Sequence, residues 1–108
     1  MNKGDIYLVD FNPAKGGEIG KLRPAVVMSG SKENSIFQTV IVMPLSTIIV
    51  KDNLPYRFLI TKRDQLKLDS DACIYEIRAL SKTRLKEKIA SINKIEMRTI
   101  KDSLCQLV

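Results

Sequence analysis

The side chains best suited to do chemistry lie in a glycine-rich stretch near the N-terminus, residues 13–24. This stretch begins and ends with proline, and its ionisable side chains are Lys15, Glu18, Lys21 and Arg23. Glycine adopts positive φ angles and lets another chain approach the backbone closely, so a loop rich in glycine can fold over a ligand. Cations on such a loop suit an anionic partner. The stretch is therefore a candidate anion-binding site.

Arg23 has the best-defined direction among these side chains. It directly precedes Pro24, and proline restricts the residue before it to an extended conformation. The guanidinium should therefore leave the start of the following strand in a fixed direction. Its charge is essentially permanent, so it could stabilise an anion. The alternative is a salt bridge to Glu18 that only orders the loop.

The composition is that of one globular domain, residues 1–108, with a single core. Apolar residues make up 44% of the chain and charged residues 28%, which is typical of a folded protein. The formal net charge of +6 favours a polyanionic partner, either a nucleic acid or an acidic protein segment.

The residue types that are missing exclude several functions. The chain has no histidine, so an imidazole base, a Ser-His triad and most zinc sites are excluded, and we expect neither a metal nor another cofactor. No run of about 18 apolar residues predicts a membrane span, and the N-terminus lacks the apolar segment of a secretory signal. We therefore expect a cytoplasmic protein, in which Cys73 and Cys105 are reduced and buried.

Apolar patterns predict a mainly β protein. The predicted strands are residues 5–11, 24–29, 39–45, 56–60, 72–79 and 88–92. The first of them is apolar on both faces, so it should be buried on both sides. Pro44 cannot donate to a strand ladder, so the third strand should end or bulge there and turn Ser46 and Thr47 toward the rim of the sheet. The polar connections at residues 29–35 and 61–71 are expected to be loops.

The last segment has the features of a helix. Asn93 is a good N-cap, and Glu96 follows three residues later as in a capping box. After this capping box, apolar residues recur at the spacing of one helical face: Met97, Ile100, Leu104 and Leu107. Earlier in the chain, Ser81 could cap a single helical turn. We expect one amphipathic C-terminal helix lying on a barrel or rolled sheet.

The order and spacing of these residues resemble a known family. Residues 4–13 (GDIYLVDFNP), then Gly16 and Glu18, then residues 23–27 (RPAVV) are similar to the N-terminal signature of the MazF/PemK toxins. These toxins are sequence-specific endoribonucleases of bacterial toxin-antitoxin pairs. Further similarity covers residues 40–47, Ile77-Arg78 with Arg84-Leu85, and the final helix, so it extends over nearly the whole domain.

The resemblance implies an SH3-like barrel of the CcdB/PemK type with a C-terminal helix, working as a homodimer. It implies cleavage of single-stranded RNA without metal, by attack of the ribose 2'-hydroxyl on the adjacent phosphate. The products would carry a 2',3'-cyclic phosphate and a 5'-hydroxyl. It also implies a cognate antitoxin whose acidic flexible tail occupies the RNA groove. Strands that are apolar on both faces in so short a chain independently favour a symmetric dimer.

The resemblance also assigns catalytic roles. Arg23 matches the family's catalytic arginine, which would stabilise charge in the transition state. Ser46 falls where the family usually has a threonine, and its hydroxyl would hold the phosphate in line. Thr47 would take that role if the register differed by one residue. The alternative is that Ser46 is an ordinary strand-end cap or turn residue. Glu18 matches a family glutamate that would orient Arg23 or accept the proton of the 2'-hydroxyl, and the alternative is a solvated loop carboxylate.

Other residues are candidates for binding RNA. Lysine and arginine side chains on the loops would contact the RNA backbone, although each could also be a solvated surface charge. The family's recognition positions on the fifth strand carry Cys73, Tyr75 and Glu76 here, so the cleaved sequence cannot be transferred from better-known members. Tyr75 would stack on a base or pack in the core. The candidates for RNA binding are Lys15, Gly16, Lys21, Lys51, Arg57, Glu76 and Arg78.

Two other functions fit the same class of fold. One is a CcdB-like toxin that poisons DNA gyrase, and the combination of Glu18 with Arg23-Pro24 argues against it. The other is a non-catalytic RNA-binding barrel, which would be favoured if the serine at position 46 were disabling. Binding with a steep salt dependence and no strand scission would identify this second alternative.

Overall fold

The computed structural model describes residues 1–11 and 22–108. The strands are β1 (Asp5–Asp10), β2 (Leu22–Val27), β3 (Thr39–Ser46), β4 (Arg57–Ile60), β5 (Ser70–Cys73), β6 (Arg78–Ser81) and β7 (Leu85–Ser91). The helical elements are α1 (Ser31–Ile36), the 3-10 turns η1 (Ile74–Glu76) and η2 (Lys82–Arg84), and α2 (Lys94–Leu107). Within the described ranges, no helix is long and apolar enough to cross a lipid bilayer.

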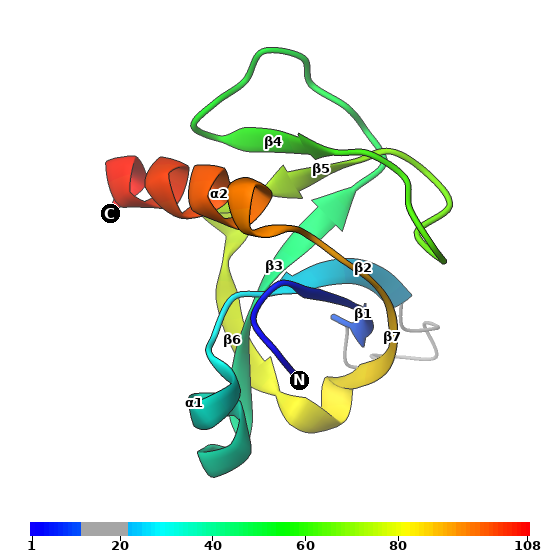
Figure 1. The fold of residues 1–108 in the computed structure, drawn as a ribbon, viewed down its shortest axis with the longest axis vertical. Coiled ribbons are helices and arrows are strands. Elements are labelled where there is room, and N and C mark those ends of the chain that lie inside the picture. Colours follow the sequence, from blue (N-terminus) through cyan, green and yellow to red (C-terminus); the bar gives the residue numbers. More distant parts are fainter. Residues whose placement is uncertain (12–21) are drawn as a thin grey trace, which may run out of the picture.

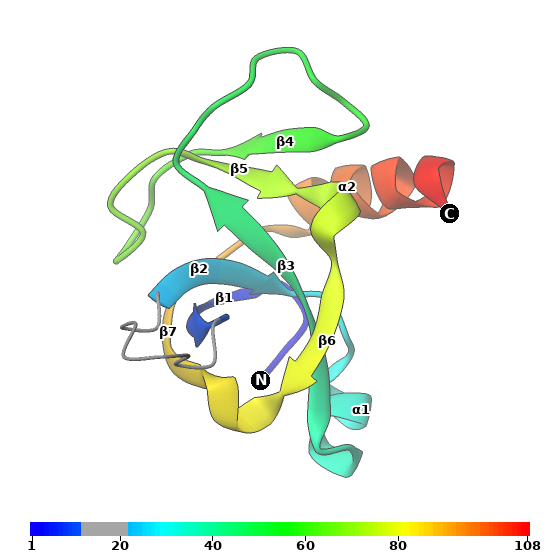
Figure 2. The same cartoon turned by 180° about the vertical axis from the view of Figure 1, so that it is seen from behind.

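The strands form one rolled antiparallel sheet. Their order is β4-β5-β3-β2-β1-β7, and β6 pairs with β3 beside this path. Figures 1 and 2 show β3 running between two groups of strands, β1, β2 and β7 on one side and β4 and β5 on the other. We call the connection between β4 and β5, residues 61–69, the arm. The Gln65 backbone N–H on the arm donates to the Ile89 carbonyl of β7 at 3.0 Å, so the arm closes the sheet into a barrel.

The strands at the centre of the sheet are buried on both faces. Ile6 and Val26 belong to one apolar cluster, whereas Val9 and Ala25 belong to a second cluster on the opposite face. All four side chains have 0% exposure. Because side chains alternate between faces along a strand, two clusters require apolar residues at consecutive positions. The prediction that the first strand is buried on both sides is therefore confirmed.

Pro44 does not end the third strand, so that prediction was wrong. β3 continues to Ser46, and Pro44 is paired with Ala25 of β2. On its other edge, β3 pairs with β6 through Val42 and with β5 from Leu45 onward. Pro44 lies in the gap between these two pairings, where a strand can continue without an N–H donor. The proline therefore marks a change of partner rather than the end of the strand.

The predicted strand at residues 72–79 was also wrong, because it is two strands separated by η1. Leu45 pairs with Ala72 and Val42 pairs with Arg78, so three steps along β3 correspond to six steps along the opposing chain. The extra residues form the 3-10 turn, which packs against α2. Ile74 is fully buried in this turn while Tyr75 is 72% exposed. Tyr75 therefore does not pack in the core.

The predicted loop at residues 29–35 contains the short helix α1. Its N-cap is Gly30, which provides no capping side chain, and the segment shows no apolar periodicity. Asn34 is the buried residue of this helix, and its side-chain amide donates to the carbonyls of Met1 and Ser29 at 3.0 Å each. Hydrogen bonds from a buried amide, one of them to the distant Met1 carbonyl, hold this helix in place.

The C-terminal helix and its capping box are confirmed. The Asn93 side chain accepts the Glu96 N–H at 2.8 Å, and the Glu96 carboxylate accepts the Asn93 N–H at 2.9 Å. Ile100 is fully buried, and Figure 1 shows α2 lying alongside the end of the barrel that contains β4 and β5. Cys73 is buried as expected, but Cys105 is exposed because it lies on the outer face of α2. Both cysteines are free thiols.

Candidate active site

Arg23 and Ser46 lie at the same edge of the sheet. Arg23 is the second residue of β2 and Ser46 is the last residue of β3. These strands are paired antiparallel through Ala25 with Pro44. This is the last pair of the ladder, and the same register continued by two residues would set Arg23 opposite Ser46, on the same face. Arg23 is exposed, and in the part of the chain that the structure describes it forms no ion pair.

The hydroxyl of Ser46 is held by its own backbone turn. Its Oγ accepts the backbone N–H of Ile48 at 3.1 Å, which leaves the hydroxyl proton able to donate to another acceptor. Thr47 follows Ser46 and lines a hollow of about 200 Å³ together with Pro24, the neighbour of Arg23. Alternation along the strand directs consecutive side chains to opposite faces. Ser46 therefore shares a face with Arg23, and Thr47 lies toward the arm.

Asp71 was not predicted to belong to this site, although it is the direct cross-strand partner of Ser46. Its side chain is almost completely buried, and Oδ2 accepts the Val50 backbone N–H at 2.8 Å. Arg57 Nη1 lies 3.7 Å from the same oxygen and donates to the Ile48 carbonyl at 3.1 Å. Asp71 and Arg57 thus hold the backbone that leaves Ser46. An acidic residue directly before a buried apolar strand segment was the available signal for this role.

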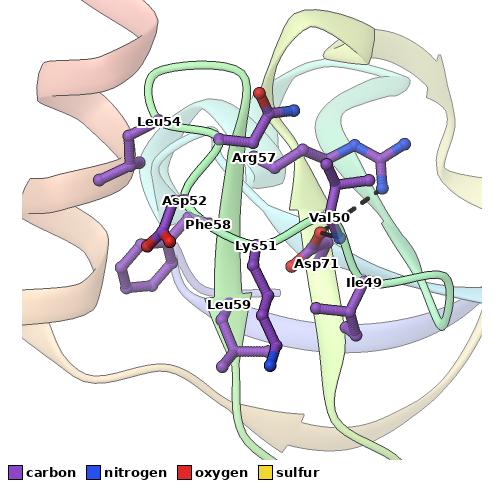
Figure 3. Close-up of a pocket in the computed structure, with 10 residues that line it drawn as sticks. Ile49, Val50, Lys51, Asp52, Leu54, Arg57, Phe58, Leu59 and Asp71 are labelled. Atoms are coloured by element: carbon purple, nitrogen blue, oxygen red, sulfur yellow. Dashed lines mark hydrogen bonds and ion pairs between the residues drawn. The ribbon is translucent and has the colours of Figure 1, made fainter.

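Lys51 and Arg57, two predicted RNA contacts, line one hollow of about 370 Å³. The hollow lies between the segment after Ser46 and strand β4, and Figure 3 shows its lining residues. Leu54 and Phe58 lie on the side toward α2, whereas Arg57 and Asp71 lie on the opposite side of β4 (Figure 3). Asp52 and Asp71 also line this hollow, so the two cations stand beside two carboxylates and a set of apolar side chains.

Glu76 and Arg78 lie on either side of the junction between η1 and β6. Both are exposed, and Arg78 Nη2 lies 4.0 Å from Glu76 Oε1. The Arg78 guanidinium also lies over the Phe11 ring, with Cζ 5.0 Å from the ring centroid, which is a cation-π geometry. Arg78 is opposite Val42, which is opposite Val27. By alternation along β2, Arg78 and Arg23 therefore project from the same face of the sheet.

Cys73 is not accessible to a nucleobase of bound RNA. It is 5% exposed, and its burial raises the pKa of the thiol, so the side chain remains neutral. The predicted site residues Lys15, Gly16, Glu18 and Lys21 lie outside the described residues. By strand alternation, Arg23, Ser46 and Arg78 thus project from one face of the sheet, whereas Thr47 lies on the opposite face.

Comparison with known proteins defines the class to which this small barrel belongs. Residues 2–108 match the family described as PemK-like, MazF-like toxin of type II toxin-antitoxin system. The chain is 36% identical over 106 residues to the Endoribonuclease MazF of Staphylococcus saprophyticus, covering 96% of this chain and 88% of that protein. The chain therefore belongs to the family of PemK-like and MazF-like toxins.

Solved structures of related toxins share the fold. A chain of a MazE-MazF structure from Deinococcus radiodurans has a TM-score of 0.82 at 20% identity, covering 99% of this chain and 94% of that chain. The Mycobacterium tuberculosis toxin MazF-mt6 has a TM-score of 0.78 at 13% identity, covering 94% of this chain and 93% of that chain. The barrel and its C-terminal helix are thus common to toxins with very different sequences.

Proposed function

We propose that this toxin is an endoribonuclease that cleaves single-stranded RNA at a short sequence motif without a metal ion. The ribose 2'-hydroxyl loses its proton, and its oxygen bonds to the adjacent phosphorus. The bond from phosphorus to the 5'-oxygen breaks, and that oxygen takes up a proton from the solvent. The products are a 2',3'-cyclic phosphate and a 5'-hydroxyl. Water does not attack the phosphorus in this step, and no redox chemistry takes place.

Arg23 and Ser46 carry the chemistry in this proposal. Negative charge accumulates on the phosphorane oxygens in the transition state, and a fixed guanidinium is worth more there than in the ground state. The Ser46 hydroxyl donates to a second oxygen of the same phosphate and keeps it in line for attack. By its match to the family, Glu18 is the candidate to accept the 2'-hydroxyl proton or to orient Arg23.

The observation that carries the proposal is the register of β2 and β3. The last pair of this ladder is Ala25 with Pro44, and the same register continued by two residues would set the Arg23 cation opposite the Ser46 hydroxyl. Buried strands hold their terminal residues rigidly, which is the preorganisation that electrostatic catalysis requires. Arg78, on the same face, adds a second positive charge for the RNA backbone.

Cleavage of a long mixed-sequence single-stranded RNA in excess chelator tests this function. We expect discrete fragments, and end-mapping should show cyclic phosphates on one side of each cut and 5'-hydroxyls on the other. Arg23→Ala should abolish cleavage and leave the circular dichroism spectrum unchanged. Intact RNA that is nevertheless bound would indicate a non-catalytic barrel. Intact RNA with inhibition of DNA supercoiling would indicate a gyrase poison.

The partners follow from the same proposal. The chain acts in the cytoplasm, where its RNA substrates are, and a cognate antitoxin with an acidic flexible tail neutralises it by occupying the cationic groove. It works as a homodimer, because side chains such as Ile48, Leu54 and Leu59 are between 46% and 73% exposed and a second copy would bury them. Sedimentation that shows only monomers at micromolar concentration would contradict the dimer.

A further inference from the structure

The arm, residues 61–69, is fixed in place on the barrel rather than lying loose on its surface. Arg63 donates from Nη1 and Nη2 to the two carboxylate oxygens of Glu96 on α2, at 2.6 and 2.8 Å. Leu66 is 3% exposed and belongs to the same apolar cluster as Ile89 of β7. Together with the hydrogen bond from Gln65 to Ile89, these contacts anchor the arm at several points. Its exposed side chains therefore have defined positions.

The arm and Thr47 enclose a basic hollow. This hollow has a volume of about 320 Å³ and is lined by Thr47, Lys62, Lys67, Leu68 and Asp69. Thr47, Lys67 and Leu68 also line the adjoining hollow that contains Pro24. The basic hollow thus adjoins Thr47 and Pro24, which are the chain neighbours of Ser46 and Arg23 and lie across the edge of the sheet from them. Nothing in the sequence pattern predicted it, because residues 61–71 had the composition of an ordinary charged surface loop.

The chemistry of the hollow suits a nucleotide. Among the described residues, Lys62 and Lys67 form no ion pair, so both ammonium groups can bind an anion. Asp69 also lines the hollow, but its Oδ1 accepts the Lys62 backbone N–H at 2.7 Å and so serves the turn of the arm. Leu68 is 61% exposed beside the lysines, where its side chain could contact a base or ribose.

We propose that this hollow is a subsite for the RNA strand next to the scissile phosphodiester. Lys62 and Lys67 bind a backbone phosphate, and Leu68 packs against the attached nucleoside. The inference rests on the proposed ribonuclease function, because it assumes that the RNA strand bound at Arg23 and Ser46 continues past Thr47 into this hollow. The contacts are to phosphate and sugar, so they position the strand and do not read its sequence.

An acidic peptide is the other anion that two lysines could bind. RNA is favoured because the hollow borders Thr47, next to the catalytic hydroxyl, and because an apolar side chain stands directly beside the two cations. An RNA strand that is bound by Arg23 at the proposed cleavage site must continue over a neighbouring surface of the barrel. The basic hollow lies next to that site, where its two lysines attract the next phosphate.

Binding of an uncleavable probe tests this inference separately from catalysis. The probe is a mixed-sequence single-stranded 2'-O-methyl RNA, which cannot undergo attack by the 2'-oxygen. Its affinity for the wild-type toxin and for Lys62→Gln, Lys67→Gln and the double variant is measured over a series of salt concentrations. Lys101→Gln is the matched control, because Lys101 is an exposed lysine on the outer face of α2.

We expect each arm variant to weaken binding and to reduce the slope of log K against log salt by about 0.7, the value for one phosphate contact on a single strand. The control should keep the wild-type slope, and all variants should keep the wild-type melting temperature. Unchanged slopes in the arm variants, equal losses in the control, or no binding by the wild type would overturn the inference.

The same variants distinguish RNA from an acidic peptide. If they bind the RNA probe like the wild type but lose affinity for poly-glutamate, the hollow is a peptide site and the inference is wrong. A wild-type protein that binds the probe through these lysines but leaves ordinary RNA intact would instead refute the proposed function. The two failures therefore give different results.

Discussion

Asp71 lies directly across the β3–β5 pair from Ser46, and its carboxylate accepts the Val50 backbone N–H at 2.8 Å. This buried acid therefore holds the chain on the far side of the turn in which Ser46 accepts the N–H of Ile48. Arg57 completes the arrangement by donating to the Ile48 carbonyl. The position of the proposed catalytic hydroxyl thus depends on a residue that does not itself reach the RNA.

We predict that Asp71→Asn lowers kcat and leaves KM nearly unchanged. Asparagine can still accept the Val50 N–H but no longer attracts Arg57, so the turn at Ser46 should shift. A misplacement of about 1 Å at a reacting group can cost about 100-fold in rate, and we expect a loss between roughly 10-fold and 100-fold. Single-turnover cleavage of RNA measures this loss. The exposed Asp102→Asn on α2 is the control, and an equal loss there would contradict the role of Asp71.

Ser46 and Thr47 can be separated by removing one hydroxyl at a time. Ser46→Ala should lower kcat by about 100-fold, as removal of one transition-state donor commonly does. Thr47→Val keeps the shape of the side chain and should retain most of the activity. Ser46→Thr should retain cleavage, because threonine keeps the hydroxyl that Ser46→Ala removes. If Thr47→Val is inactive and Ser46→Ala is active, the catalytic hydroxyl is on Thr47 and the register argument fails.

The ion pair between Arg63 and Glu96 makes stability depend on pH. The hydrogen bonds from Arg63 lower the pKa of the Glu96 carboxyl, so the folded protein holds the ionised form more tightly than the unfolded chain does. The stabilisation is therefore complete above the unfolded pKa of about 4.3 and is lost as the pH falls through the lower folded pKa. The lost free energy should be on the order of 1 kcal/mol for this well-formed pair.

Urea unfolding of the wild type and Glu96→Gln at neutral and acidic pH checks this dependence. Glutamine can preserve the capping box, so the comparison isolates the charge. The variant should be less stable at pH 7, and the difference should shrink below about pH 4. A difference that stays constant down to pH 3 would mean that the loss comes from packing or capping rather than from the ion pair.

The sequence predicted best those features that arise from local pattern. The capping box of Asn93 and Glu96 and the apolar face through Ile100 are local, and the structure confirms both. The site was predicted through the resemblance to MazF/PemK toxins, and the pairing of β2 with β3 is consistent with Arg23 and Ser46 lying at one end of these strands. Features that depend on contacts between distant segments were missed. The bulge at η1 arises because β5 and β6 share one edge of β3, and no local pattern records that.

Asp71 and the arm illustrate the same limit. In the sequence, Asp71 is the end of a charged stretch, and only the pairing of β5 with β3 shows that it is buried beside Ser46. Lys62 and Lys67 look like ordinary surface charges until the closure of the barrel brings them to Thr47. Burial and convergence of polar groups are tertiary properties, so they became visible only in three dimensions.

The contrast between the two thiols has a practical consequence. Cys105 is exposed on α2, whereas Cys73 is buried and has a raised pKa, so a maleimide should modify Cys105 selectively at neutral pH. A fluorophore or spin label can therefore be attached to the unmutated chain at one known position. Energy transfer or dipolar spectroscopy between two labelled copies would then report the geometry of the assembly directly in solution.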